Sequence, residues 1–123
     1  NLVEYRLRNA QEKLEEAEIL LEAGKYKDSI GRSYYAVFSS LRAVLARDKV
    51  DFSKHAGVIS YFQREYIKSG IFDVKYSRYI QSAFQIRNSC DYDDFYLATK
   101  NDAEEQYQKA VELYSEIRHY LER

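Results

Sequence analysis

The sequence predicts an all-α fold, an up-and-down bundle of four or five helices. The 123 residues contain no proline and only four glycines, the two residue types that usually break a chain into strands and tight turns. Apolar residues recur at spacings of three and four along most of the chain, which places them on one face of a helix. With 46% hydrophobic residues, a chain of this length can bury one core, so we expect a single domain over residues 1–123.

The first expected helix has a regular apolar stripe, formed by Val3, Leu7, Ala10, Leu14, Ala17 and Leu21. Gly24 follows it, and glycine tolerates the left-handed conformation that ends a helix. The second helix is expected from Tyr26 to Arg47. Its apolar residues are spread over more than one face, so we expect it to be central and contacted on several sides.

Ser53 is expected to be the N-cap of a third helix at about 54–69, which ends at Gly70. A fourth helix is expected at about 73–91, followed by a loop at 92–98.

Thr99 and Asp102 resemble a capping box, with Asp in place of Glu or Gln, at the start of the last helix. That helix repeats the spacing of the first, at Ala103, Tyr107, Ala110, Tyr114, Ile117 and Leu121. We expect the first and last helices to pack on each other and on the second and fourth helices.

Charge is distributed unevenly, although the net charge is only −1. Residues 24–90 contain twelve Lys and Arg against five Asp and Glu, whereas 1–23, 91–98 and 99–123 are each acidic overall. A basic middle segment attracts phosphates or an acidic partner, and it is equally compatible with an ordinary mixed surface.

Several classes of chemistry are excluded by the motifs. The sequence has no glycine-rich phosphate loop, HExxH or CxxC motif, and its one cysteine cannot form an internal disulfide. We therefore expect no metal and no cofactor. No apolar run approaches the length of a membrane span, and no signal peptide is recognisable, so we expect a cytoplasmic protein that does not enter a membrane. Because the sequence lacks methionine, we expect the natural chain to begin before Asn1.

The segment QIRNSCDYDDF, residues 85–95, is the main candidate site. Arg87 and Asp91 are four residues apart and share a helical face, which is compatible with a simple local ion pair. The alternative is a binding cluster. Arg87 offers a planar fork for phosphate, Asn88 offers a donor and an acceptor, and Tyr92 offers a stacking ring. His55, in the first turn of the third helix, fits first an ordinary surface or satisfied-core histidine. It is also a base candidate, because the helix dipole disfavours its charged form.

The order of GKYKDSIGRSYYAVFSSLRAVL, SKHAGVISYF and RNSCDYDD between two long helices resembles the HEPN superfamily. The nearest resemblance is to small stand-alone prokaryotic members whose signature ends in Arg-x-x-x-Asp-Tyr. It implies a HEPN-like bundle that forms a homodimer with its motif at a shared cleft. Arg87, Asn88, Asp91, Tyr92, Arg32 and Tyr35 form the expected RNA- or nucleotide-binding set.

Many members of that superfamily are metal-independent ribonucleases. Their motif Arg steadies the phosphate, and a His four to six residues later does acid–base work. Arg87 and Asn88 match the first two motif positions, and Tyr92 stands where His is expected. Tyrosine has an unperturbed pKa of about 10 and is a poor base at neutral pH.

The resemblance also implies a protein partner. Small HEPN proteins are commonly encoded beside a minimal nucleotidyltransferase as toxin–antitoxin pairs, and some nucleotidyltransferases adenylylate a tyrosine near the motif. Tyr92 is the candidate acceptor here.

Three hypotheses follow: the HEPN partner of a nucleotidyltransferase that binds RNA or nucleotide, a ribonuclease with a degenerate motif, and a helical interaction module without chemistry. An Arg87 head group held in an internal ion pair, remote from any groove between subunits, would contradict the binding cluster.

Overall fold

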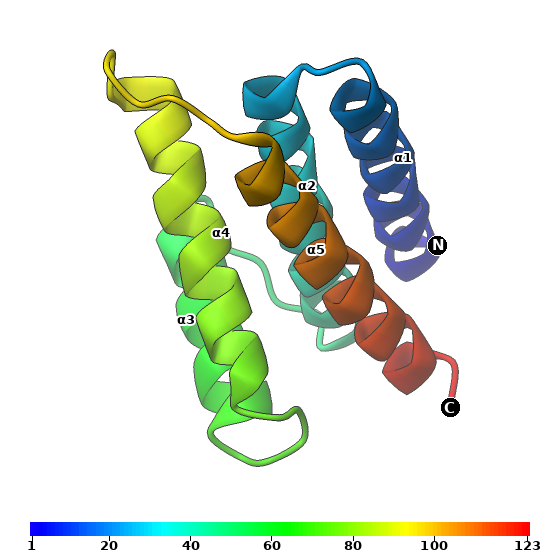
Figure 1. Cartoon of the computed structure of the whole chain (residues 1–123). Coiled ribbons are helices and arrows are strands. Elements are labelled where there is room, and N and C mark those ends of the chain that lie inside the picture. Colours follow the sequence, from blue (N-terminus) through cyan, green and yellow to red (C-terminus); the bar gives the residue numbers. More distant parts are fainter.

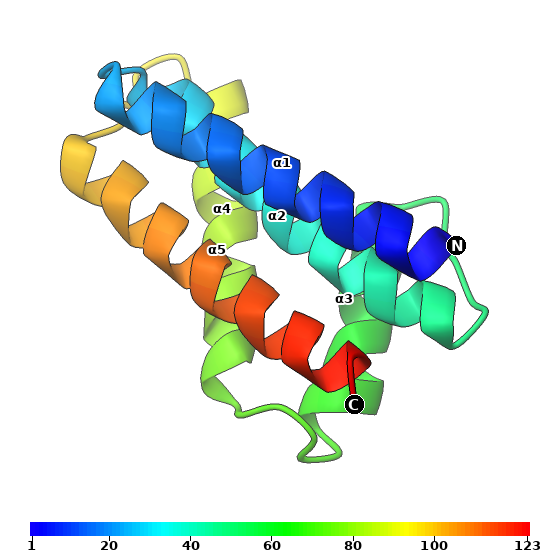
Figure 2. The same cartoon turned by 90° about the vertical axis from the view of Figure 1, so that its right-hand side faces the viewer.

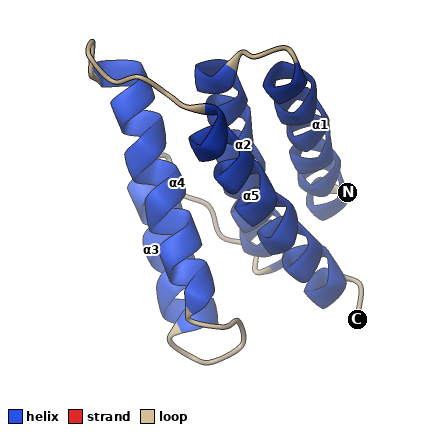
Figure 3. Ribbon diagram, in the orientation of Figure 1, coloured by secondary structure: helices blue, strands red, loops and turns tan.

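The computed structural model describes residues 1–123, and all of its regular elements are helices (Figure 3). They are α1 (Leu2–Glu22), α2 (Tyr26–Arg47), α3 (His55–Phe62), the π-helical turn η1 (Gln63–Ile67), α4 (Lys75–Tyr92) and α5 (Lys100–Leu121). The all-α, five-helix prediction is confirmed. None of the helices is both long and apolar enough to cross a membrane.

Helix α2 is the centre of the bundle, as its wide apolar surface predicted. It packs against α1, α3, α4 and α5, and its residues Leu41, Ala43, Val44 and Leu45 are fully buried. In Figure 1, α1 and α4 run in the opposite direction to α2 and α5, and both chain termini lie at the same end.

The first and last helices pack on each other and on α2, as expected (Figure 2). The predicted packing of α1 on α4 is not formed to any extent, because α2 and α5 lie between them (Figure 1). Helix α3 runs in the same direction as α2, since the segment 48–54 returns along the bundle before α3 begins.

Two predicted helix boundaries are confirmed. Gly24 has φ +77° directly after α1, a conformation in which glycine carries no Cβ penalty. Thr99 and Asp102 form the complete capping box at the start of α5, with the Thr99 hydroxyl accepting from the Asp102 backbone N–H at 3.0 Å.

The third helix differs from the prediction at both ends. Lys54, not Ser53, is the N-cap residue, and no side chain caps the helix. The expected single helix over 54–69 is α3 followed by η1, which ends at Ile67. Gly70 still ends the segment with φ +88°. A π-helical turn has i→i+5 backbone hydrogen bonds, and the spacing of apolar residues in the sequence does not reveal them.

Candidate functional site

The residues of the segment 85–95 occupy the last turns of α4 and the loop that follows. The Arg87 side chain is only 17% exposed, and that of Asp91 is 44% exposed. Asn88 is half-buried and its side chain forms no hydrogen bond, while Tyr92 is 77% exposed. The helix therefore holds Arg87 against the bundle and leaves Tyr92 in solvent.

Arg87 packs against two adjacent tyrosines of α2 and is paired with Asp91. Its Cζ atom lies 5.2 Å from the ring centroid of Tyr34 and 5.6 Å from that of Tyr35, within cation–π range. Nη2 donates a hydrogen bond to the Tyr35 hydroxyl at 3.0 Å. Asp91 Oδ2 lies 2.9 Å from Nε, but off the N–H direction, so this contact is an ion pair without an aligned hydrogen bond.

The local ion pair considered from the sequence is therefore present. It restricts how Arg87 can bind a ligand. Arg87 does not present all of its donors to solvent, because Asp91 and Tyr35 engage one side of the guanidinium. Nη1 makes no hydrogen bond within the chain. An incoming phosphate would use this nitrogen first and would compete with Asp91 for the rest of the fork.

His55 lies in the same cluster, although it is 32 residues from Arg87 in the sequence. The Tyr34 hydroxyl is 2.8 Å from His55 Nδ1, and the Phe38 ring centroid is 4.0 Å from that of His55. Tyr34 thus contacts the imidazole with its hydroxyl and the Arg87 guanidinium with its ring. Helix α2 holds the cluster together because α3 and α4 both pack against it.

The electrostatics of the cluster keep its imidazole neutral and its phenol protonated. Burial, followed by the positive charges of Arg87 and Arg42, lowers the pKa of His55 below its ordinary value. Burial raises the pKa of Tyr34 to about 12, against the opposing effect of Arg87. With Nδ1 engaged by Tyr34, Nε2 is the ring nitrogen left for a ligand.

The structure brings together only part of the set expected from the sequence. Arg87, Asp91, Tyr35 and His55 lie in one cluster, with Asn88 beside Arg87 on α4. Arg32 instead forms an ion pair with Glu16 of α1. Tyr92 forms no hydrogen bond or aromatic contact.

Tyr34 is the residue that the sequence did not single out. It lies on the expected apolar stripe of α2 and is 2% exposed, so its pattern is that of an ordinary core residue. Only the pairing of α2 with α3 reveals its role between His55 and Arg87.

A pocket of about 450 Å³ adjoins this cluster on the side of the segment 48–54. Its lining residues are Phe38, Arg42, Asp51, Phe52, Ser53 and His55. Asp51 accepts hydrogen bonds from Arg42 at 2.9 Å and from the buried Arg6 at 3.3 Å. This pocket thus combines an imidazole, a guanidinium and two aromatic rings.

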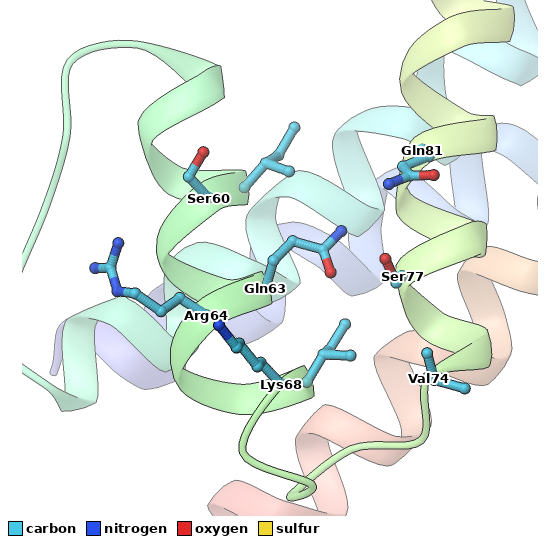
Figure 4. A pocket seen from close by; sticks show the side chains of 9 residues that line it. Ser60, Gln63, Arg64, Lys68, Val74, Ser77 and Gln81 are labelled. Atoms are coloured by element: carbon cyan, nitrogen blue, oxygen red, sulfur yellow. The ribbon is translucent and has the colours of Figure 1, made fainter.

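A wider groove of about 670 Å³ lies between α3 with η1 and α4 (Figure 4). Gln63 and Gln81 reach into it from opposite sides, and Ser60 and Ser77 add hydroxyls (Figure 4). The Arg64 head group points away from it in this view. The groove is lined by neutral polar and aliphatic groups together with two cations, Arg64 and Lys68, and it contains neither an imidazole nor a carboxylate. Because it lacks a group for acid–base chemistry, we place the candidate site at Arg87 and His55 instead.

Comparisons with known proteins agree with this architecture. A family model described as HEPN domain matches residues 3–120. A UPF0332 protein of Thermotoga maritima is 34% identical over 91 residues, which cover 74% of this chain and 69% of that protein. Methanocaldococcus jannaschii has a protein named "Putative toxin MJ0142" that is 30% identical over 119 residues, covering 97% of this chain and 81% of its own length.

A second protein of that archaeon, named "Putative toxin MJ0605", is 37% identical over 83 residues, or 68% of this chain and 62% of its own. The family match spans all five helices and includes the segment that holds Arg87. The resemblance read from RNSCDYDD and the SYYAVF helix is therefore confirmed: this chain belongs to the HEPN domain family.

Proposed function

We propose that this chain is the HEPN component of a toxin–antitoxin-like module and that it binds RNA or a nucleotide at Arg87. The observation that carries the proposal is the packing of the Arg87 guanidinium against Tyr34 and Tyr35. His55 contacts the hydroxyl of the same Tyr34. The names of the two archaeal relatives support the toxin-like role.

Phosphate binding at this site depends on competition. Arg87 Nη1 is unengaged, whereas Nε faces Asp91 at 2.9 Å. A phosphate that binds both the Nε and the Nη side of the Arg87 guanidinium displaces the Asp91 carboxylate. This carboxylate is 44% exposed, so it can move into solvent. Tyr35, at 37% exposed, offers part of its ring for stacking with a base.

The direct test is the affinity of the protein for single-stranded RNA, measured by fluorescence anisotropy. Arg87→Gln is expected to weaken binding about tenfold, the loss of one charge-assisted phosphate contact. Arg78→Gln is the matched control, because Arg78 lies on the same helix, is exposed and has no ion-pair partner. Equal affinities of the two variants would reject Arg87 as the phosphate contact.

We further propose that the chain forms a homodimer and is the partner of a minimal nucleotidyltransferase that adenylylates Tyr92. The hydroxyl of Tyr92 is accessible, since this side chain is 77% exposed and makes no hydrogen bond. Mass spectrometry of the protein co-expressed with a minimal nucleotidyltransferase from the same genome is expected to find an added AMP on Tyr92, lost in Tyr92→Phe. AMP on another tyrosine, or on none, rejects this assignment.

A second candidate function is RNA cleavage, and the position of His55 favours it. In that reaction a 2′-hydroxyl attacks the adjacent phosphorus, the bond from phosphorus to the 5′-oxygen breaks, and this oxygen takes a proton from water. The products are a 2′,3′-cyclic phosphate and a 5′-hydroxyl. The neutral imidazole of His55 would take the proton of the 2′-hydroxyl, and Arg87 would stabilise the charge that builds on the phosphoryl oxygens. This assignment replaces the motif His with a residue of another helix.

Cleavage of RNA in the presence of a chelator separates the hypotheses. Loss of cleavage in both His55→Gln and Arg87→Gln, with Arg78→Gln unaffected, supports the ribonuclease. Binding without cleavage supports the nucleotide-binding partner. A protein that neither binds nor cleaves RNA, yet forms a stable complex with the nucleotidyltransferase, supports the helical interaction module.

A further inference from the structure

The pocket beside His55 contains groups that the Arg87 site does not use. It has a volume of about 450 Å³ and lies between α2 and the segment 51–55. Volumes of this size are typical of small-molecule sites. We propose that it receives a nucleobase, so that the base is held here while Arg87 holds the phosphate. This inference rests on the proposed function and adds to it a binding site for the base of the nucleotide.

Phe52 supplies a ring that is fixed in place yet accessible. It is 41% exposed, and its ring centroid lies 5.8 Å from that of Tyr61. Its Cβ and ring atoms pass so close to Gly57 that a Cβ added there would meet them at 2.9–3.1 Å. Gly57 therefore lets the ring lie directly on the α3 backbone, at the wall of the pocket. An immobilised exposed ring is what base stacking requires, because little side-chain entropy is lost on binding.

Arg42 supplies unused hydrogen-bond donors. Its Nη2 donates to Asp51 at 2.9 Å, and its Cζ lies 6.0 Å from the Phe38 ring centroid. Nε is buried and has no partner, so the donors open to a ligand are those of the terminal amino groups. Of these, Nη1 makes no hydrogen bond within the chain.

Asp51 is held in turn by Arg6 at 3.3 Å and by the backbone N–H of Phe52 at 2.9 Å. The polar wall of the pocket is thus positioned before any ligand arrives, and it combines a donor and an acceptor that can meet the edge of a base.

The pocket and the phosphate site are joined by one tyrosine. His55 lines the pocket, and its Nδ1 is 2.8 Å from the Tyr34 hydroxyl. The Tyr34 ring is in turn 5.2 Å from Arg87 Cζ. Two aromatic walls with polar groups between them suit a flat heterocycle better than a sugar or a free phosphate. A nucleobase is therefore the occupant that matches both the shape and the chemistry.

The test is a chemical-shift titration of the protein labelled with ¹⁵N, using adenosine, AMP and ribose 5-phosphate separately. Adenosine is expected to shift the amide signals of residues 52–55, ribose 5-phosphate those of 87–91, and AMP both sets. Shifts at 87–91 alone with AMP overturn the base pocket and leave the proposed function standing. Shifts at 52–55 alone support the pocket and reject Arg87 as the phosphate contact. No shift with any of the three overturns both.

Two variants distinguish the loss of base stacking from a loss of folding. Phe52→Ala is expected to weaken adenosine binding at least about fivefold, the loss of one base–aromatic stack. Phe95→Ala removes another exposed ring, 97% exposed and outside the pocket, and is expected to change adenosine binding less than about twofold. Ribose 5-phosphate binding is expected to be the same in both variants. Equal adenosine affinities of the two variants overturn the proposal.

Discussion

Arg87 is engaged on one side by groups of its own chain. Asp91 neutralises it, Tyr35 accepts from it, and the Tyr34 ring covers one face. These contacts are each modest in energy, since an ion pair between partly exposed groups contributes on the order of 0–1 kcal/mol. If Arg87 holds an anionic ligand as proposed, that ligand is expected to replace Asp91 at small cost, so the pair would lower the affinity without abolishing binding.

Asp91→Asn is expected to strengthen RNA binding about threefold or more, because it releases the guanidinium and removes one negative charge near it. Anisotropy titrations at fixed salt measure this change. Asp94→Asn is the matched control, since Asp94 lies in the loop directly after α4, three residues from Asp91, is exposed and pairs with no cation. An equal gain in both variants would mean that only the net charge of the loop matters.

His55 makes stability depend on pH in a direction set by its lowered pKa. Between the folded-state value and the ordinary value of about 6.5, the unfolded chain binds more protons, so the free energy of unfolding falls as pH decreases. Urea unfolding at about pH 7 and pH 5 is expected to show a smaller loss in His55→Gln than in the natural sequence. Parallel losses in the two proteins would show that the histidine titrates normally.

The helices were predictable where a single residue or a local pattern decides the backbone. The bounds of α2 coincide with the predicted Tyr26–Arg47, and Gly24 and the Thr99 capping box end and begin helices as expected. Ser53 was wrong as a cap. The segment before α3 is fixed by long-range contacts of Asp51 and Phe52, which sequence spacing does not contain.

Only the part of the candidate site that lies on α4 was predictable from the sequence. Arg87 and Asp91 are one turn apart, so their pairing follows from helix geometry. The link from Tyr34 to His55 joins two helices across 21 residues, and it depends on how α3 packs on α2. The same limit applies to the position of Arg32 against Glu16 of α1.

Two glycines provide opposite tests of the helix assignments. Gly24→Ala is expected to destabilise the protein by about 1 kcal/mol, because alanine at φ +77° is strained. Gly31→Ala, in the interior of α2 with nothing within 4 Å of an added Cβ, is expected to stabilise it by about 0.5–1 kcal/mol. Urea unfolding measures both, and effects of the same sign would contradict the helix end at Gly24.

Asp51 connects α1, α2 and the segment before α3. Its carboxylate joins Arg6 to Arg42, and the Phe52 N–H and Arg42 lower its pKa. Asp51→Asn is expected to cost about 1 kcal/mol in unfolding free energy at neutral pH, a modest value because the carboxylate is 48% exposed. The difference from the natural sequence should vanish as pH falls through the pKa of Asp51 in the folded state, since protonation then breaks the same contacts. Asp94→Asn, expected to be neutral within about 0.5 kcal/mol, is the control.

Across the bundle, basic and acidic side chains come from different segments of the chain. The basic segment 24–90 supplies Arg42, His55 and Arg87, whereas the first and last helices and residues 91–98 are acidic overall. Helix α2 contacts every other helix except the turn η1, so it positions groups from three helices around Tyr34. If the chain binds RNA as proposed, the polyanion is expected to be attracted by the residues of 24–90 and repelled by those of 91–98.

The side-chain Nε–H signal of Arg87, followed by NMR during titration with a short single-stranded oligoadenylate, reports directly on the phosphate contact. We expect this signal to shift to saturation as phosphate replaces Asp91, with the Arg78 signal unchanged. An Arg87 signal that stays fixed in its pair with Asp91, whether or not the RNA binds elsewhere on the protein, would contradict the assignment of Arg87 as the phosphate-binding residue.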